Sequence, residues 1–194
     1  MVDPQTPVDL AERVASVARG LGIETAVIGA YALAVYGYVR ATTDLDLATV
    51  ASLDQLQRLA EALRDEGLQT RLSLPDDLDV LGGVLRVWIR IDEDGDPFEP
   101  IEVINFFNPH RPRRAPAADA VSRAIGIAER PALRYVQLDD LIALKLDAGS
   151  RADLADVVEL LKRNASADRA TIRATSKRYG FDVIDVLIAE ADAG

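Results

Sequence analysis

The sequence predicts an α/β (α+β) protein, with a mixed sheet flanked by helices and followed by a helical C-terminal part. Before residue 137, short apolar runs typical of strands alternate with helical segments. After that point only helical periodicity remains, apart from short connections. The chain has 194 residues and is 49% hydrophobic, which is enough to bury a core. We therefore expect a core over residues 1–136 and a helical part over residues 137–194 packed on it.

The core is expected to contain three helices, each ended by a glycine signal or begun by a cap. These helices are 8–21, 30–36 and 52–66. Ser52 is the expected N-cap of the third, with Gln55 at the capping-box position. Runs rich in β-branched and apolar residues predict the strands. The expected strands are 25–28, 44–49, 68–72, 84–91 and 98–107, with a further candidate at 133–136.

Residues 84–91 and 98–107 are expected to form a hairpin around the acidic turn 92–97. In the first of these strands, Leu85, Val87, Ile89 and Ile91 fall on one face. The turn lacks the glycine and glutamate positions of an EF-hand loop, so it is interpreted as a solvated turn.

The helical part begins after a linker at residues 111–116 and the candidate strand at 133–136. Its expected helices are 138–148, 151–163, 167–179 and 183–191. The basic run from His110 to Arg114 lies in the linker and is interpreted as solvated. His110 is the sole histidine, so a Ser-His-Asp triad or a histidine metal cluster would depend on it.

Composition excludes several classes of protein. The net charge of −10 argues against a broad basic surface that coats nucleic acid. The absence of cysteine excludes disulfides and thiolate metal sites. No apolar run is long enough to span a membrane, and the N-terminus does not resemble a signal peptide. We therefore expect a cytoplasmic protein with no membrane partner.

Asp44 and Asp46 form the pattern that carries chemistry. In a strand, residues two apart point to the same side, so their carboxylates would lie side by side with Leu45 and Leu47 on the other face. Two such charges repel each other, and a divalent cation relieves the repulsion. Mg²⁺ takes oxygen ligands and is often held by one or two carboxylates and substrate phosphates. Upstream, Gly29 follows a strand and precedes a helix, where backbone N–H groups can approach a phosphate.

The segment 27–47 resembles the signature of the nucleotidyltransferases of the DNA polymerase β superfamily. It is most similar to the small bacterial members grouped with abortive-infection and toxin–antitoxin nucleotidyltransferases. Their pattern is a glycine and a small residue after a strand, then Arg-x-Thr-x-Asp-x-Asp, and Arg40, Thr42, Asp44 and Asp46 fit it. Many members have Ser where this chain has Ala30, which offers its backbone N–H alone.

The resemblance implies a nucleotidyltransferase-type mixed sheet. It implies transfer of a nucleoside monophosphate from a nucleoside triphosphate to an acceptor hydroxyl, with Mg²⁺, or Mn²⁺ in its place. Asp44 and Asp46 would be catalytic metal ligands. Gly29, Ala30, Arg40 and Thr42 would bind the nucleotide. The acceptor is left open among RNA, a protein and a small molecule.

The resemblance also implies a third acid on a neighbouring strand, for which Glu102 is the candidate metal ligand. From the residues alone, Glu102 could instead pair with Arg86 or Arg90 across the hairpin. A lysine is implied as well, and Lys145 fits this position on an apolar helical face. It would reach the triphosphate, although a boundary lysine with its amine in water has the same spacing.

Around this lysine the resemblance implies supporting residues. Arg151, Asp153 and Asp156 match them, and the acids would orient basic side chains and the helix. Two other functions remain open at this stage. The chain could be a catalytically degenerate fold that serves as a toxin–antitoxin partner, or a module that binds nucleotide without turnover.

Overall fold

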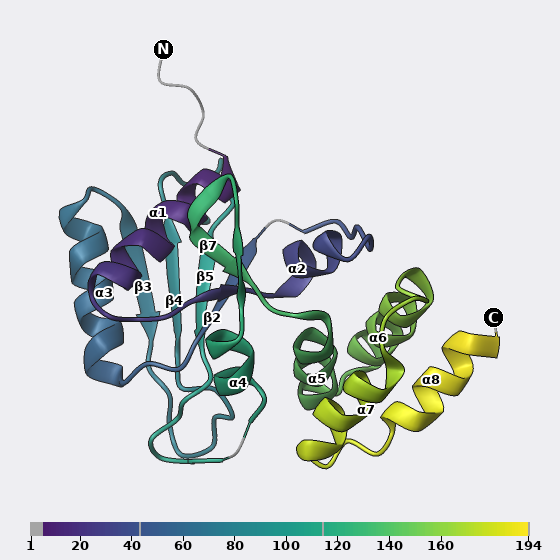
Figure 1. Ribbon diagram of the computed structural model, residues 1–194. Helices are drawn as coiled ribbons and strands as arrows, with labels where there is room; N and C mark the ends of the chain where they lie inside the picture. The colour runs from purple at the N-terminus through teal and green to yellow at the C-terminus, as the bar shows by residue number, and fades with distance from the viewer. Residues whose placement is uncertain (1–5, 43, 114, 194) are drawn as a thin grey trace.

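The computed structural model describes residues 6–42, 44–113 and 115–193. Within them the chain forms a seven-stranded mixed sheet and eight helices (Figure 1). The strands are β1 (Ala26–Val27), β2 (Leu45–Thr49), β3 (Gln69–Ser73), β4 (Val84–Trp88), β5 (Ile101–Asn105), β6 (Ile125–Ile127) and β7 (Arg130–Tyr135). The helices are α1 (Pro7–Gly20), α2 (Gly29–Val35), α3 (Leu53–Asp65), α4 (Ala117–Ser122), α5 (Leu138–Ala148), α6 (Arg151–Arg163), α7 (Arg169–Arg178) and α8 (Ile184–Ala193).

The sheet order is β3-β4-β5-β2-β1-β7-β6. β2 pairs in parallel with β5, and β1 in parallel with β7, while the other neighbours are antiparallel. The two parallel pairings join segments far apart in the sequence, and they bring β2 and β5 to the centre of the sheet. The predicted class, a mixed sheet with helices and a helical C-terminal part, is confirmed.

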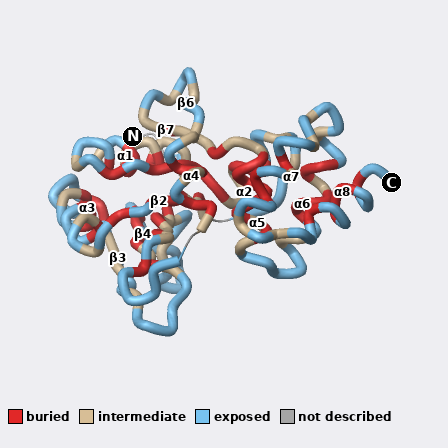
Figure 2. The backbone as a smooth tube through the Cα atoms, turned by 60° about the horizontal axis from the view of Figure 1, so that its bottom comes forward, coloured by how far each residue is buried: buried red, intermediate tan, exposed pale blue. Residues whose placement is uncertain are grey.

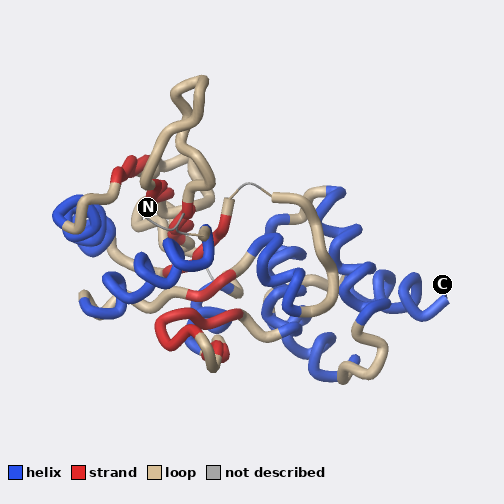
Figure 3. Tube along the Cα trace, turned by 90° about the horizontal axis from the view of Figure 1, so that it is seen from above, coloured by secondary structure: helices blue, strands red, loops and turns tan. Residues whose placement is uncertain are grey.

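Helices α1 and α3 contact each other and lie on the same side of the sheet (Figure 1). The helices α5 to α8 pack on one another beside the strands. Seen from above, they lie to one side of the sheet (Figure 3). Figure 2 shows buried segments running through both the strands and these helices, with exposed loops at the periphery. No helix in the described part of the chain is long and apolar enough to cross a membrane.

Helix ends follow the local signals in the sequence. Ser52 accepts a hydrogen bond from the backbone N–H of Gln55, and the Gln55 side chain accepts one from the N–H of Ser52. This is the predicted capping box, and it satisfies two N–H groups that the helix leaves unpaired. Gly67 follows the end of α3 with a positive φ of 83°, as expected of a glycine that stops a helix.

The predicted hairpin is formed, but its first strand is shorter than expected. β4 ends at Trp88, and Leu85 and Val87 are fully buried. Ile89 and Ile91 were predicted to share their face, yet they are 45% and 60% exposed. Beyond Trp88 the chain leaves the sheet. The apolar alternation continues in the sequence, but no neighbouring element covers the Ile89 and Ile91 side chains. The turn 92–97 lies at this exposed extension, closed by a bridge between Ile91 and Pro97.

Two short elements were not predicted. α4 follows the linker, and β6 pairs with β7 as a hairpin. α4 has six residues and β6 has three, with Gly126 at its centre. Such lengths are too short for a periodic pattern to emerge.

The end of β5 is fastened by a fully buried asparagine. The Asn105 amide accepts hydrogen bonds from the backbone N–H of Ala51 and Phe107. Its Nδ2 amide donates hydrogen bonds to the backbone oxygens of Ala51, Gly82 and Phe107. The Asn105 side chain therefore links the loop segments at Ala51, Gly82 and Phe107, next to the C-terminal ends of β2 and β5.

We expect Asn105→Ala to lower the free energy of unfolding by about 2–4 kcal/mol, because several buried backbone groups lose their partner. Denaturant titration would measure this. Asn105→Leu, which fills a similar volume without polar atoms, should be no more stable than the alanine variant. A leucine variant as stable as the unsubstituted protein would contradict the assignment of Asn105 as a polar fastening.

Candidate active site

The position of Asp46 follows from the alternation of β2. Leu45 and Leu47 are buried on one side of the strand, so the Asp46 side chain emerges on the opposite side. In the parallel pairing of β2 with β5, Asp46 is the register partner of Glu102. The sheet thus places two acids from distant segments side by side.

Asp44 completes a cluster of three acids. It was expected to begin the strand 44–49, but β2 begins at Leu45, so Asp44 lies immediately before the strand. The Thr42 hydroxyl donates a hydrogen bond of 2.9 Å to the Asp44 carboxylate and holds it in place. One carboxylate oxygen from each of Asp44, Asp46 and Glu102 lies within 4.8 Å of the others. Oxygen atoms at these separations fit a divalent cation such as Mg²⁺, which prefers carboxylate ligands.

The cluster changes the acidity of Asp46. Burial, together with the neighbouring charges of Asp44 and Glu102, raises the pKa of Asp46 from 3.8 to about 6, and the positive charge of Lys145 offsets part of the rise. Burial is the largest cause, and the like charges of the cluster add to it. The site therefore favours the binding of a cation.

Glu102 satisfies both interpretations that its sequence allows. It belongs to the acidic cluster, and its carboxylate also accepts a hydrogen bond of 2.6 Å from Nε of Arg86, its partner across β4 and β5. Arg90, the other candidate partner, stacks over the ring of Phe98 instead. The Arg86 side chain is half exposed, so it screens Glu102 from one side and leaves the other side to the cluster.

Gly29 is placed where a side chain could not stand. It has a φ of +62°, and a Cβ added there would lie 2.0 Å from Oδ2 of Asp46. The adjacent Ile28 N–H donates to the backbone oxygen of Asp46. Gly29 therefore lets the start of α2 approach the carboxylate closely. Ala30 follows as the second residue of α2 and is half-buried.

Lys145 lies on α5 with its amine between two acids of α6. Its Nζ is 2.7 Å from Asp153 and 2.9 Å from Asp156. Burial alone would lower the pKa of Lys145, but the hydrogen bonds to these acids raise it above its usual value. Asp156 also receives Arg40, whose Nη1 lies 2.6 and 2.8 Å from its two oxygens. The carboxylates thereby fix the positions of both cations.

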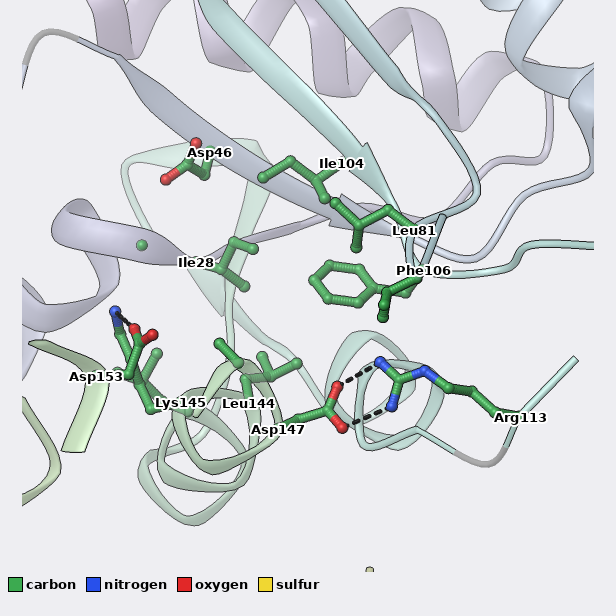
Figure 4. A pocket seen from close by; sticks show the side chains of 14 residues that line it. Ile28, Asp46, Leu81, Ile104, Phe106, Arg113, Leu144, Lys145, Asp147 and Asp153 are labelled. Carbon is green, nitrogen blue, oxygen red and sulfur yellow. Dashed lines mark hydrogen bonds and ion pairs between the residues drawn. The ribbon is translucent and has the colours of Figure 1, made fainter. Parts of the chain in front are cut away.

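A cavity of about 460 Å³ is lined by Gly29, Asp46, Lys145 and Asp153, among other residues. It lies between the sheet and α5, with Asp46 and Lys145 at one end (Figure 4). Its walls are mainly apolar, from Ile28, Ile104, Phe106, Leu141 and Leu144 among others. A concave, mostly apolar site with a few convergent polar groups is the usual form of a small-molecule site.

The structure brings some of the predicted site residues together at the acidic cluster and the cavity, and it leaves others outside the cavity. Asp44, Asp46, Glu102 and Gly29 adjoin one another, and Lys145 lines the same cavity. Thr42 and Arg40 contact Asp44 and Asp156 rather than the cavity. Asp153 contacts Lys145, and Asp156 contacts both Lys145 and Arg40. Arg151 is exposed at the first position of α6.

The linker makes one contact that was not predicted. Arg113 is exposed, as expected of a solvated linker, but it also forms a two-point ion pair with Asp147 of α5 and lines the cavity. No local pattern predicts this contact, because the two residues come from different elements. His110 lies in the loop, and its backbone N–H donates to Asn108. Arg114 lies outside the described residues.

Comparison with known proteins adds fold likenesses at low identity. No family model and no curated protein matches the chain. Among solved structures it is similar to the antibiotic-resistance factor ANT(2'')-Ia, at 19% identity and a TM-score of 0.49, covering 96% of this chain and 91% of the other. An antigenic nucleotidyltransferase-like protein from Paracoccidioides brasiliensis has 17% identity and a TM-score of 0.49, covering 93% and 91%. A candidate nucleotidyltransferase from Helicobacter pylori has 16% identity and a TM-score of 0.48, covering 100% and 83%.

These structures include the class of protein that the Asp44–Asp46 motif resembles. With identities under 20% and TM-scores below 0.5, they are likenesses and carry no inference about chemistry. The interpretation of the site depends on its own geometry.

We expect Asp46→Asn to stabilise the metal-free protein by about 1–3 kcal/mol at neutral pH. The folded-state pKa of Asp46 is above the value of 3.8. Its ionisation therefore costs nothing below pH ~4 and the full amount above about pH 6, so stability falls as pH rises through this window. Unfolding measured in EDTA from pH 4 to 8 should show this slope in the unsubstituted protein and a reduced slope in the variant.

Asp185→Asn serves as the control for this prediction. Hydrogen bonds from Lys177 and Arg173 lower the pKa of Asp185, so its removal should not stabilise the protein. An Asp46→Asn variant that melts well below the unsubstituted protein without metal would show that Asp46 holds the fold through attraction instead.

We expect Gly29→Ala to displace Asp46 and to weaken binding of Mg²⁺ or Mn²⁺ at least about tenfold, because the added Cβ overlaps the carboxylate. Gly37→Ala is a matched control, since Gly37 also has a positive φ, +78°, but has nothing within 4 Å of the added Cβ. Both variants should lose roughly 1 kcal/mol or more of stability from backbone strain. Titration with Mn²⁺ followed by paramagnetic relaxation separates them, and equal affinity in both would contradict the close approach.

Proposed function

We propose that this protein is a nucleotidyltransferase that moves a nucleoside monophosphate from a nucleoside triphosphate to an acceptor hydroxyl, with Mg²⁺. The observation that carries the proposal is the convergence of Asp44, Asp46 and Glu102, with carboxylate oxygens within 4.8 Å, beside a cavity that Lys145 lines. Phosphoryl-type transfer depends mainly on positioning and on charge neutralisation, and this arrangement provides for both.

The three acids fit a divalent cation by their chemistry and by their crowding. When bound there, the cation neutralises phosphate charge and assists the leaving group. Asp44 and Asp46 are the ligands we propose, with Thr42 orienting Asp44. Glu102 is a ligand or the acceptor of the hydroxyl proton, and its contact with Arg86 fixes its orientation.

The phosphates of the nucleotide are assigned to the end of the cavity formed by Gly29 and Lys145. The first N–H groups of a helix have no partner within it, so the backbone at Gly29 and Ala30 can donate to phosphate oxygens. Lys145 contributes a fixed positive charge. The acceptor oxygen attacks the α-phosphorus, the bond to the β-phosphate oxygen breaks, and pyrophosphate leaves. The hydroxyl proton passes to a carboxylate of the cluster.

The alternative is a catalytically degenerate partner in a toxin–antitoxin pair, which the departures from the family pattern at Ala30 and Glu102 would favour. Against it, Asp44, Asp46 and Glu102 cluster together, Asp46 and Lys145 line one cavity, and Ala30 still offers its backbone N–H. The acceptor remains RNA, a protein or a small molecule in this proposal.

The test is transfer of label from each of the four nucleoside triphosphates, with Mg²⁺ or Mn²⁺, into a cell extract separated into RNA, protein and small molecules. We expect label from the α-phosphate to appear in one fraction and label from the γ-phosphate to appear in none, because pyrophosphate leaves. EDTA should abolish transfer. Asp44→Asn and Asp46→Asn should each lower it at least about 10²-fold, since the charge on the phosphates goes unneutralised.

Asp185→Asn, a surface acid on α8, is the matched control and should keep full activity. Transfer of the γ-label would identify a kinase instead of a nucleotidyltransferase. Undiminished α-label transfer in both Asp44→Asn and Asp46→Asn would remove these residues from the site.

A further inference from the structure

A second polar group lines the cavity across from the carboxylates. Arg113, from the loop between β5 and α4, pairs with Asp147 in the last turn of α5. Nη1 lies 2.6 Å from Oδ1 and Nη2 lies 2.7 Å from Oδ2, so the pair is planar and held at two points. The Asp147 side chain is 10% exposed. Figure 4 shows the pair across the cavity from Asp46, with Ile28, Phe106 and Leu144 between them in this view.

The middle of the cavity is apolar on two opposed sides. Leu81, Ile104 and Phe106 come from the sheet and its loops, and Leu141 and Leu144 come from α5. Apolar walls of this kind favour a flat, weakly hydrated ring over a charged or strongly hydrated group. The volume of about 460 Å³ lies in the range of sites that hold a small molecule.

The order of groups along the cavity indicates which ligand fills it. Asp46 and Lys145 occupy one end, with Gly29 next to Asp46, the apolar walls follow, and the Arg113–Asp147 pair lies at the other end. A nucleoside triphosphate has the same order: phosphates, a sugar, and a flat base with a polar edge. Among the described residues that line the cavity, the polar side chains away from the phosphate end are those of Arg113 and Asp147.

We propose that the Arg113–Asp147 pair reads the hydrogen-bonding edge of the nucleobase and sets which nucleotide the protein uses. This inference rests on the proposed nucleotidyltransferase function and extends it to the choice of substrate. Within a two-point pair, the carboxylate keeps free lone pairs and the guanidinium keeps further N–H donors. The pair therefore presents acceptors and donors side by side, in an order that its own geometry fixes.

A fixed order of donors and acceptors discriminates between bases, because the four bases present different orders along their edges. A base that does not match leaves its own edge, or the largely buried Asp147 carboxylate, without a hydrogen-bond partner, and such mismatches carry large penalties in binding. Neither partner can turn to accommodate the wrong base without breaking the ion pair. We therefore expect the unsubstituted protein to prefer one or two of the four nucleotides at least about tenfold.

The experiment measures the dissociation constants of the four nucleoside triphosphates, as non-hydrolysable α,β-methylene analogues with Mg²⁺, by calorimetry. Inorganic tripolyphosphate is the probe for the phosphate end. Asp147→Asn replaces an acceptor oxygen by a donor amide. It should weaken the preferred nucleotide at least about tenfold and change the ranking of the four, while tripolyphosphate binds as before.

Three further variants make the result specific. Arg113→Lys keeps the charge but loses the planar fork, so it should also change the ranking and provides the test if Asp147→Asn does not fold. Phe106→Leu removes a ring from the wall and should weaken all four nucleotides alike without changing their order. Asp185→Asn removes an acid of a different ion pair, with Arg173, and should change nothing.

Equal binding of all four nucleotides to the unsubstituted protein, lost in Asp46→Asn, would overturn this inference and leave the proposed function standing. A ranking unaltered in both Asp147→Asn and Arg113→Lys would also overturn it and make the pair a structural link between the loop and α5. Failure of every nucleotide to bind would overturn the proposed function, and this inference with it.

Discussion

The crowding of three carboxylates beside a cavity is the constraint that shapes the surrounding structure. Carboxylate oxygens of Asp44, Asp46 and Glu102 within 4.8 Å repel one another, and burial of Asp46 adds to the cost. The three carboxylates stay close together because the backbone holds the residues that carry them in place. Leu45 and Leu47 supply that anchorage on the other face of β2, and the parallel pairing with β5 fixes the register. Cost carried by the fold in this way is typical of a functional site rather than of a stabilising interaction.

A second charged network joins the helical part to Arg40, in the segment that leads to Asp44. In this network opposite charges attract, whereas the carboxylates of the acidic cluster repel one another. Asp156 is almost fully buried and holds both Arg40, from the segment after α2, and Lys145, from α5. Buried ion pairs are weak contributors to stability once desolvation is counted. Their value here is positional, because one carboxylate of α6 sets the place of two cations from separate elements. The helical part thus supplies Lys145 to the cavity and also secures the segment that leads to Asp44.

The sequence predicted those features that depend on neighbours along the chain. The alternation of Leu45, Asp46 and Leu47 and the capping box of Ser52 are local, and both are present. Pairings across the sheet are not local. Nothing in the hairpin itself says that Glu102 meets Asp46, so this contact was expected through resemblance alone. The same limit explains Arg113, whose partner is 34 positions away, and Ile89, whose alternation continues after the sheet has ended.

The rigidity of α5 determines whether such a cavity can discriminate between ligands. Its first turn is fixed by Arg123, which pairs with Asp139 and Asp140 at 2.6 and 2.7 Å, and by the Thr175 hydroxyl, which donates to Asp139. Its last turn ends at Gly149 with a left-handed φ of 68° and passes at once into the capped start of α6. A helix fastened at both ends keeps the residues along it at fixed separations. Lys145 and Asp147 lie on this one helix, so the helix fixes their separation. Under the proposed function, a nucleotide that contacts both would meet side chains that are preorganised before it binds.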